Sequence, residues 1–204
     1  MPRPSRTTAL LLASATALTL LGAADSSAQV RSSVREFGRT SVRSGIPVDA
    51  KRFAVTSPDL VNGGFPQSNW ANAFGCDGGN RPLHLEWHGA PEGTRSFAVT
   101  MFDLDAPTGS GFWHWLSWDL PATTTALGDT PPPGTVSGTD DAGLRGYLGP
   151  CPPVGDRPHR YRITVYALDT PSLALPAETP PAVTAFTMSG HVLAYAQVTA
   201  VAAR

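Results

Sequence analysis

The sequence lacks any excess of positive charge. Its 204 residues carry 15 basic and 16 acidic side chains, for a net charge of −1, and Lys51 is the single lysine. Proteins that bind nucleic acid usually concentrate Lys and Arg on one face or along one element. The composition therefore gives no indication of a nucleic-acid partner. The sequence also has no internal repeat.

Cysteine is scarce, with Cys76 and Cys151 as the two examples. Two cysteines without a Cys-x-x-Cys spacing make a poor zinc signature, so we expect no metal site. In an exported protein, an even pair is typical of a disulfide. Two separate buried thiols are the alternative, which is common inside a cell. Because the N-terminus indicates export, we predict a disulfide between Cys76 and Cys151.

Apolar runs long enough to span a membrane are also lacking. The run over residues 9–23 is short for a span and is interrupted by Thr and Ser. Two arginines precede it and a small-x-small site follows it, which is the pattern of a secretory signal peptide. We expect residues 1–28 to be that peptide, with cleavage after Ala28, or after Ala24 as a second choice. The mature protein would be secreted or periplasmic, without a transmembrane segment.

Residues 29–50 are polar, and arginine recurs at every fourth position from Arg31 to Arg43. On a helix these arginines would form one basic stripe, but little apolar surface is available to fix such a helix. We expect a flexible leader over residues 29–50. A single domain is then expected over residues 51–204, because one domain is usual for a chain of this length.

Glycine and proline are abundant, with 20 of each spread along the chain, and this suits a turn-rich β protein. Alternating apolar runs that are typical of half-buried strands occur at 53–56, 83–87, 96–102, 116–120, 162–168 and 195–201. A Thr-Pro-Pro-Ala start at 179–182 predicts a short helix before the last strand. Its apolar face is expected to hold Val183, Phe186 and either Leu193 or Met188. The fold class is therefore mainly β.

The stretch Asp103-Leu-Asp-Ala-Pro107 follows one of these strands, and His114 opens the next. A hairpin-like connection brings its two ends together, so Asp103 or Asp105 could meet His114 in space. A carboxylate beside an imidazole is often functional, because each group shifts the pKa of the other. The alternative is that Asp-x-Asp-x-Pro caps a turn through bonds to its own backbone. The spacing alone leaves both interpretations open.

Further motifs give the chain a family resemblance. Gly146-Tyr-Leu-Gly-Pro-Cys-Pro-Pro153 leads to His159-Arg-Tyr161, and Gly109-Ser-Gly-Phe-Trp-His-Trp115 follows the aspartate motif. Together these motifs closely resemble the phosphatidylethanolamine-binding protein (PEBP) family, in particular its bacterial, Raf kinase inhibitor-like branch. The resemblance extends from Phe53 to Val201.

The resemblance implies a PEBP-like β-sandwich of antiparallel sheets, of Greek-key type, with a short C-terminal helix and a final strand. It also implies a shallow anion pocket at one end of the sandwich. Phosphate, or a phospholipid head group such as phosphoethanolamine, is the expected ligand. By position in the motifs, the ligand-binding residues would be Asp103, Asp105, Pro107, His114, Pro150, Cys151, Pro152, His159 and Tyr161.

The types of these residues suit such a ligand. Imidazoles and the Cys151 N–H can donate to phosphate oxygens, while the flanking prolines stiffen that turn. The two carboxylates would repel an anion, so we expect them to orient His114 and hold it charged, or to receive the ammonium of a zwitterion. Relatives typically have proline where this chain has Leu104, which frees an N–H at the pocket edge. Asp140 or Asp141 is expected to bond to the pocket loop.

Two other classes of function stay open. One is a protein-interaction module that inhibits a kinase or protease, although export argues against a cytosolic kinase as its partner. The other is an Asp/His hydrolase, or a metal enzyme built on Asp103, His114 and His159. The sequence has no Gly-x-Ser-x-Gly nucleophile elbow. We therefore expect a binding protein rather than an enzyme, with no catalytic residues and no cofactor.

Overall fold

The computed structural model describes residues 37–38 and 43–204. The expected signal peptide and residues 29–36 and 39–42 of the expected leader lie outside the described residues. Among the residues that are described, none of the helices has the length and apolar character needed to cross a membrane.

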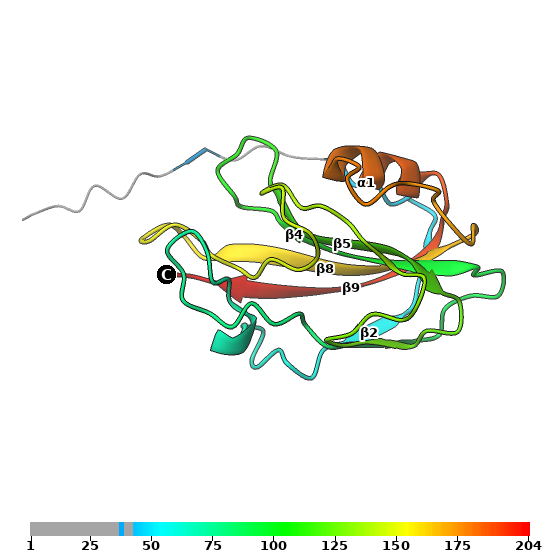
Figure 1. Ribbon diagram of the computed structural model, residues 1–204, viewed down its shortest axis with the longest axis horizontal. Coiled ribbons are helices and arrows are strands. Elements are labelled where there is room, and N and C mark those ends of the chain that lie inside the picture. The colour runs from blue at the N-terminus through cyan, green and yellow to red at the C-terminus, as the bar shows by residue number, and fades with distance from the viewer. Residues whose placement is uncertain (1–36, 39–42) are drawn as a thin grey trace, which may run out of the picture. The chain divides into compact units, whose positions relative to one another are not determined.

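The larger of two sheets has six strands in the order β1-β9-β8-β4-β5-β7 (Figure 1). Their bounds are Lys51–Arg52 for β1, Val192–Ala202 for β9, His159–Leu168 for β8, Ser96–Asp103 for β4, Phe112–Pro121 for β5 and Val136–Ser137 for β7. Neighbouring strands are antiparallel, except that β1 runs parallel to β9. The central strand β4 therefore has β5 on one side and β8 on the other.

The smaller sheet consists of β2 (Ala54–Thr56), β3 (Leu85–His88) and β6 (Ala126–Leu127), all antiparallel. A main core of buried side chains lies between the two sheets and includes Trp87, Phe97, Met101, Tyr161 and Ile163. Removing this apolar surface from water is the principal force that holds the sheets together. A short 3₁₀ helix, η1 (Gln67–Asn69), interrupts the long connection between β2 and β3.

The opposite face of the six-stranded sheet carries the helix α1 (Pro181–Ser189) (Figure 1). A second core of Ala98, Leu116, Trp118, Leu168, Leu173 and Met188 forms there. Side chains alternate between the two faces along each strand. In β8, Tyr161 and Ile163 therefore belong to the main core, while Arg162 and Thr164 point to the face that carries α1.

The predicted helix face is only partly correct. α1 buries Pro181, Thr184 and Met188, which lie on one side of a helix of 3.6 residues per turn. Val183 and Phe186 are 48% and 81% exposed, because they lie on the other side of the same helix. The predicted start at the proline pair is confirmed, and Gly190 is the C-cap of the helix. The mainly β class, with a short helix before a final strand, is also confirmed.

Candidate functional site

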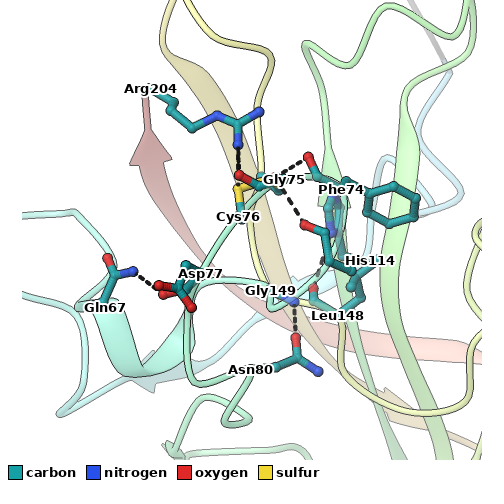
Figure 2. The surroundings of a disulfide bond; sticks show 12 residues. Gln67, Phe74, Gly75, Cys76, Asp77, Asn80, His114, Leu148, Gly149 and Arg204 are labelled. Atoms are coloured by element: carbon teal, nitrogen blue, oxygen red, sulfur yellow. Dashed lines mark hydrogen bonds between the residues drawn. A yellow bond between two sulfur atoms is a disulfide. The ribbon is translucent and has the colours of Figure 1, made fainter.

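The predicted disulfide between Cys76 and Cys151 is present (Figure 2). It ties the 74–80 loop to the Gly-Pro-Cys-Pro-Pro loop. Asn80 adds a second tie, because its Nδ2 donates to the Tyr147 carbonyl (3.1 Å) and its Oδ1 accepts from the Gly149 N–H (2.8 Å). The Arg204 guanidinium donates to the Gly75 carbonyl at 2.6 Å. The loop that carries Cys151 is therefore held at both of its ends.

Asp103 caps the turn that follows β4 and also contacts an imidazole. Its Oδ1 accepts from the N–H groups of Asp105 (2.8 Å) and Ala106 (3.1 Å). Its Oδ2 lies 2.7 Å from Nδ1 of His159. The interpretation of the aspartate motif as a turn cap is therefore confirmed, and the same carboxylate also meets an imidazole. The imidazole partner, however, is His159 on β8 rather than His114 on β5.

His159 is held between two carboxylates. Its Nδ1 meets Asp103, and its Nε2 lies 3.1 Å from Oδ2 of Asp156. Burial alone would lower the pKa of His159, but the hydrogen bonds and charges of the two carboxylates outweigh burial and raise the pKa. Both ring nitrogens face carboxylate oxygens, which accept hydrogen bonds, so the geometry favours the protonated ring. Since both ring nitrogens already have partners, His159 has no N–H left for a phosphate oxygen.

His114 has the opposite electrostatic state. It is 7% exposed, and burial lowers its pKa to about 4, although the charge of Asp103 opposes this shift. Its Nδ1 lies 3.1 Å from the Leu148 carbonyl (Figure 2). A carbonyl can only accept, so Nδ1 carries the proton and Nε2 keeps its lone pair. At neutral pH, His114 is therefore a neutral ring whose Nε2 is an acceptor.

The prediction that the carboxylates orient His114 and hold it charged is thus wrong. Asp103 pairs across the sheet with Tyr161 of β8 as well as with Phe112 of β5, and its side chain turns toward the β8 side. There it meets His159, which precedes Tyr161 by two residues. Leu104 extends the same ladder, because its N–H donates to the Arg160 carbonyl at 3.0 Å. The N–H that replaces the family's proline therefore has a structural use.

Tyr161 lies at the centre of the predicted site. Its ring centroid is 5.2 Å from that of His114 and 6.4 Å from that of His159. The buried hydroxyl makes no hydrogen bond of ordinary geometry to the described residues, although Asp103 and the Cys151 N–H lie close to it. Burial raises the pKa of this phenol, Asp103 raises it further, and the Cys151 N–H acts in the opposite direction. We refer to Asp103, His114, Cys151, His159 and Tyr161 as the Tyr161 cluster.

Asp105 and Pro107 lie elsewhere. Asp105 accepts from the Arg160 backbone N–H (2.9 Å) and from its guanidinium at 2.8 and 3.1 Å, and Arg157 lies 3.8 Å away. Asp105 and Pro107 line a separate cavity of about 180 Å³ with Arg157 and Arg160.

The two prolines beside Cys151 differ in role, since the Pro150 carbonyl accepts from the Ala71 N–H at 3.2 Å while the Pro152 side chain is buried.

Sequence reasoning missed two residues of the site, Asn80 and Asp156. The Asp-x-x-His spacing of Asp156 and His159 was an available signal, whereas no signal close in sequence indicates Asn80.

Asp141 accepts from the Trp113 N–H at 2.8 Å, next to His114, and Asp140 caps its own turn. Within residues 37–38 and 43–204, no three His, Cys, Asp or Glu side chains are grouped to hold a metal ion.

Known proteins resemble this chain over most of the described domain. The UPF0098 protein YbcL of Escherichia coli (strain K12) is 42% identical over 161 residues, which is 74% of this chain and 88% of YbcL. The UPF0098 protein YbhB of the same organism is 40% identical over 154 residues, or 72% of this chain and 97% of YbhB.

Solved structures resemble the fold as well. The crystal structure of E. coli YbcL, described as a new member of the mammalian PEBP family, matches with a TM-score of 0.72 and 41% identity, covering 75% of this chain and 99% of YbcL. CT736 from Chlamydia trachomatis D/UW-3/CX matches with a TM-score of 0.65 and 25% identity, covering 76% and 99% of the two chains. The model of the phosphatidylethanolamine-binding protein family matches residues 48–203. The chain therefore belongs to the phosphatidylethanolamine-binding protein family, and its relatives YbcL and YbhB are bacterial.

Proposed function

We propose that the protein binds a small phosphorylated ligand, such as phosphoethanolamine, at the Tyr161 cluster. The main support is the buried Tyr161 hydroxyl, which makes no hydrogen bond of ordinary geometry to the described residues, although the Asp103 carboxylate and the Cys151 N–H lie close to it. A buried polar group without a partner costs about 1–3 kcal/mol. A phosphate oxygen that accepts from this hydroxyl would recover that free energy. Membership of the family supports the same ligand class.

The charge state of His114 narrows the form of the ligand. A neutral ring with a lone pair on Nε2 accepts a hydrogen bond and cannot donate a second one. A phosphomonoester that keeps one proton offers both an acidic O–H for His114 and unprotonated oxygens for Tyr161. The second pKa of such esters is about 6, so this form predominates below that pH.

The accessible part of the cluster fits a shallow site. Tyr161 and His159 are fully buried, whereas His114 is 7% exposed and Cys151 is half-buried. A ligand therefore approaches over His114 and Cys151. Two hydroxyls of the connecting turn, Thr108 and Ser110, are exposed, and Thr108 donates to the Gly111 carbonyl. These positions support binding rather than catalysis.

Calorimetric titration with phosphoethanolamine, inorganic phosphate and ethanolamine tests the proposal. We expect the two phosphorylated ligands to bind and ethanolamine alone to give no heat. Tyr161→Phe should weaken binding roughly tenfold, the value of a hydrogen bond to a charged group. Tyr195→Phe is the matched control, because this half-buried tyrosine stacks on Arg52 away from the cluster. Unchanged binding in Tyr161→Phe would refute the site.

The pH dependence of binding shows whether the proton between His114 and the ligand comes from the ligand or from the ring. With phosphoethanolamine, affinity should rise as pH falls from 8 to 5. A sulfate ester of ethanolamine has no titrating proton in this range, so its binding should not change with pH if the ligand supplies the proton. If the sulfate ester shows the same rise, protonation of His114 on binding is the cause, and the monoprotonated ligand form is wrong.

The location that best suits this chain is outside the cytoplasm. The Cys76–Cys151 disulfide supports it, because such bonds persist mainly in oxidising compartments. The predicted signal peptide points the same way. Mass spectrometry of the native protein should find it in the periplasm or medium, starting at Gln29 or Asp25. A full-length chain recovered from the cytoplasm with both thiols free would contradict this.

A protein-interaction role is the second candidate. Phe74 and Val154 are 63% and 74% exposed and lie on the two loops that the disulfide joins. An exposed apolar pair at a structured site is a feature of docking surfaces. Replacement of both by Ser should abolish partner capture and leave phosphoethanolamine binding unchanged. Retained capture by the double variant would remove this candidate.

A further inference from the structure

A second cavity lies on the other face of the six-stranded sheet, with a volume of about 560 Å³. Its floor is formed by outward-facing residues of β4, β8 and β9, including Thr100, Arg162 and Thr164, and its walls by α1 and residues 43–46. None of the five residues of the Tyr161 cluster lines it. Cavities of roughly 300–1,000 Å³ are typical of small-molecule sites.

The alternation of strand residues separates the two sites. Asp103 and Tyr161 point to the main core, whereas Phe102 and Arg162, each one position away, line the cavity. The cavity and the Tyr161 cluster are therefore on opposite sides of the same two strands. A ligand in one cannot contact the side chains of the other.

Arg162 provides an unpaired charge in the floor of this cavity. The arginines that form ion pairs among the described residues are Arg81, Arg145, Arg157 and Arg160. Neither Arg162 nor Arg43, which lies at the rim, is paired with a carboxylate in the part of the chain that the structure describes. A half-buried guanidinium has five N–H donors that favour an anionic partner.

The acid that lines the cavity does not neutralise Arg162. Asp141 is engaged by the Trp113 N–H at 2.8 Å, and burial raises the pKa of its carboxyl. Around Arg162 the floor offers uncharged hydrogen-bonding groups, since Thr100 and Thr164 are buried and Gln197 donates to the Thr164 hydroxyl at 2.9 Å. The balance of charge in the cavity is therefore positive.

The remainder of the lining is apolar and aromatic. Phe102 and Trp113 pack with ring centroids 4.5 Å apart, and Met188 and Phe186 of α1 also line the cavity. Phe186 is 81% exposed, which is unusual for a phenylalanine on a helix that packs on a sheet. An occupant with an apolar body would cover these surfaces.

We propose that this cavity is a second binding site, for a small amphipathic carboxylate. The carboxylate would form a bidentate pair with Arg162, as guanidinium geometry favours. The apolar body would lie between the Phe102–Trp113 pair and α1. This ligand class differs from the phosphorylated ligand of the Tyr161 cluster, because the cavity supplies a large apolar wall that the cluster lacks.

Titration of the full chain with decanoate, and with decanol as the uncharged control, tests the proposal by calorimetry and by the change in tryptophan fluorescence. We expect one decanoate per chain, and decanol to bind more weakly. Arg162→Gln should weaken decanoate binding roughly tenfold or more, as expected for a charge-assisted hydrogen bond, and leave decanol unchanged. Arg145→Gln is the matched control, since Arg145 is exposed, pairs with Glu178 and does not line the cavity.

A variant that fills the cavity makes the test independent of charge. Ala185→Trp on α1 places a large side chain inside the lining, so it should abolish binding of both decanoate and decanol while thermal unfolding stays cooperative. Equal decanoate affinity in the native chain, Arg162→Gln and Ala185→Trp would overturn the proposal. Loss of decanoate binding in Tyr161→Phe, with Arg162→Gln unaffected, would also overturn it and assign decanoate to the Tyr161 cluster.

Discussion

His114 and His159 are both buried beside Tyr161, yet they have opposite charge states. His159 is held between Asp103 and Asp156, which raise its pKa. His114 faces a backbone carbonyl, and burial lowers its pKa to about 4. Burial alone removes the charge from an imidazole, whereas two hydrogen-bonded carboxylates keep it. The identity of the partner, rather than the depth of burial, therefore decides which of the two histidines is charged.

The largest effect should come from the loop that encloses His114. The disulfide spans 75 residues, and on the chain-entropy model it stabilises the protein by up to about 4.5 kcal/mol. A Cys76→Ala/Cys151→Ala double variant should lose most of that free energy in denaturant unfolding. It should also raise the pKa of His114, because release of the loop exposes that ring to water, and leave the pKa of His159 unchanged. An unchanged His114 pKa would show that the disulfide does not maintain its burial.

Removal of one carboxylate from His159 should have the next largest effect. Asp103→Asn keeps the side-chain volume and an acceptor for the turn, but leaves a buried imidazolium with one counter-charge. Breaking a buried pair in this way costs about 3 kcal/mol or more. The matched control is Asp169→Asn, because Asp169 pairs with His191 at 2.8 Å where both side chains are exposed. That pair should contribute less than about 1 kcal/mol. Similar losses for the two variants would contradict the role given to burial.

The acid dependence of stability should be smaller and should come from His114. Its folded pKa lies below the unfolded value of 6.5, so the unfolded chain binds more protons between those values. Stability from this group is fully present above pH 6.5 and falls as pH drops toward 4, by about 3 kcal/mol at most. His114→Gln should flatten the unfolding free energy over this range. A wild-type slope that persists in the variant would assign it to other groups.

His159 should change the stability of the protein with pH in the opposite direction. Its folded pKa is raised, so its contribution is present below the unfolded pKa and is lost as pH rises through the folded pKa. The stability of the native chain should therefore decline on both the acid and the alkaline side.

The sequence predicts the fold because strand alternation and helix-start residues are local signals. The 96–102 and 116–120 runs, the proline pair at the start of α1 and the paired cysteines all fall in this class. The imidazole partner of Asp103 is not signalled locally. β4 has a neighbouring strand on each side, and the hairpin motif reveals β5 but not β8. The neutral state of His114 depends on the Leu148 carbonyl, 34 residues away, and on burial. Neither is visible in the spacing of residues.

The sequence motifs also placed Asp105 and Pro107 in the same site as His114. The structure brings Asp105 to Arg160 instead, because a β8 guanidinium reaches it in a bidentate arrangement. Proximity in sequence to Asp103 did not fix the direction in which the carboxylate points.

Nuclear magnetic resonance titration of the two imidazoles tests the difference between them most directly. We expect His114 to stay neutral, with its proton on Nδ1, down to about pH 4, and His159 to remain charged at pH values above the ordinary pKa of an imidazole. Phosphoethanolamine should shift the His114 Nε2 resonance and leave both nitrogens of His159 unchanged. Titration of both rings together near 6.5, or a ligand shift at His159 alone, would show that the two histidines do not differ in this way.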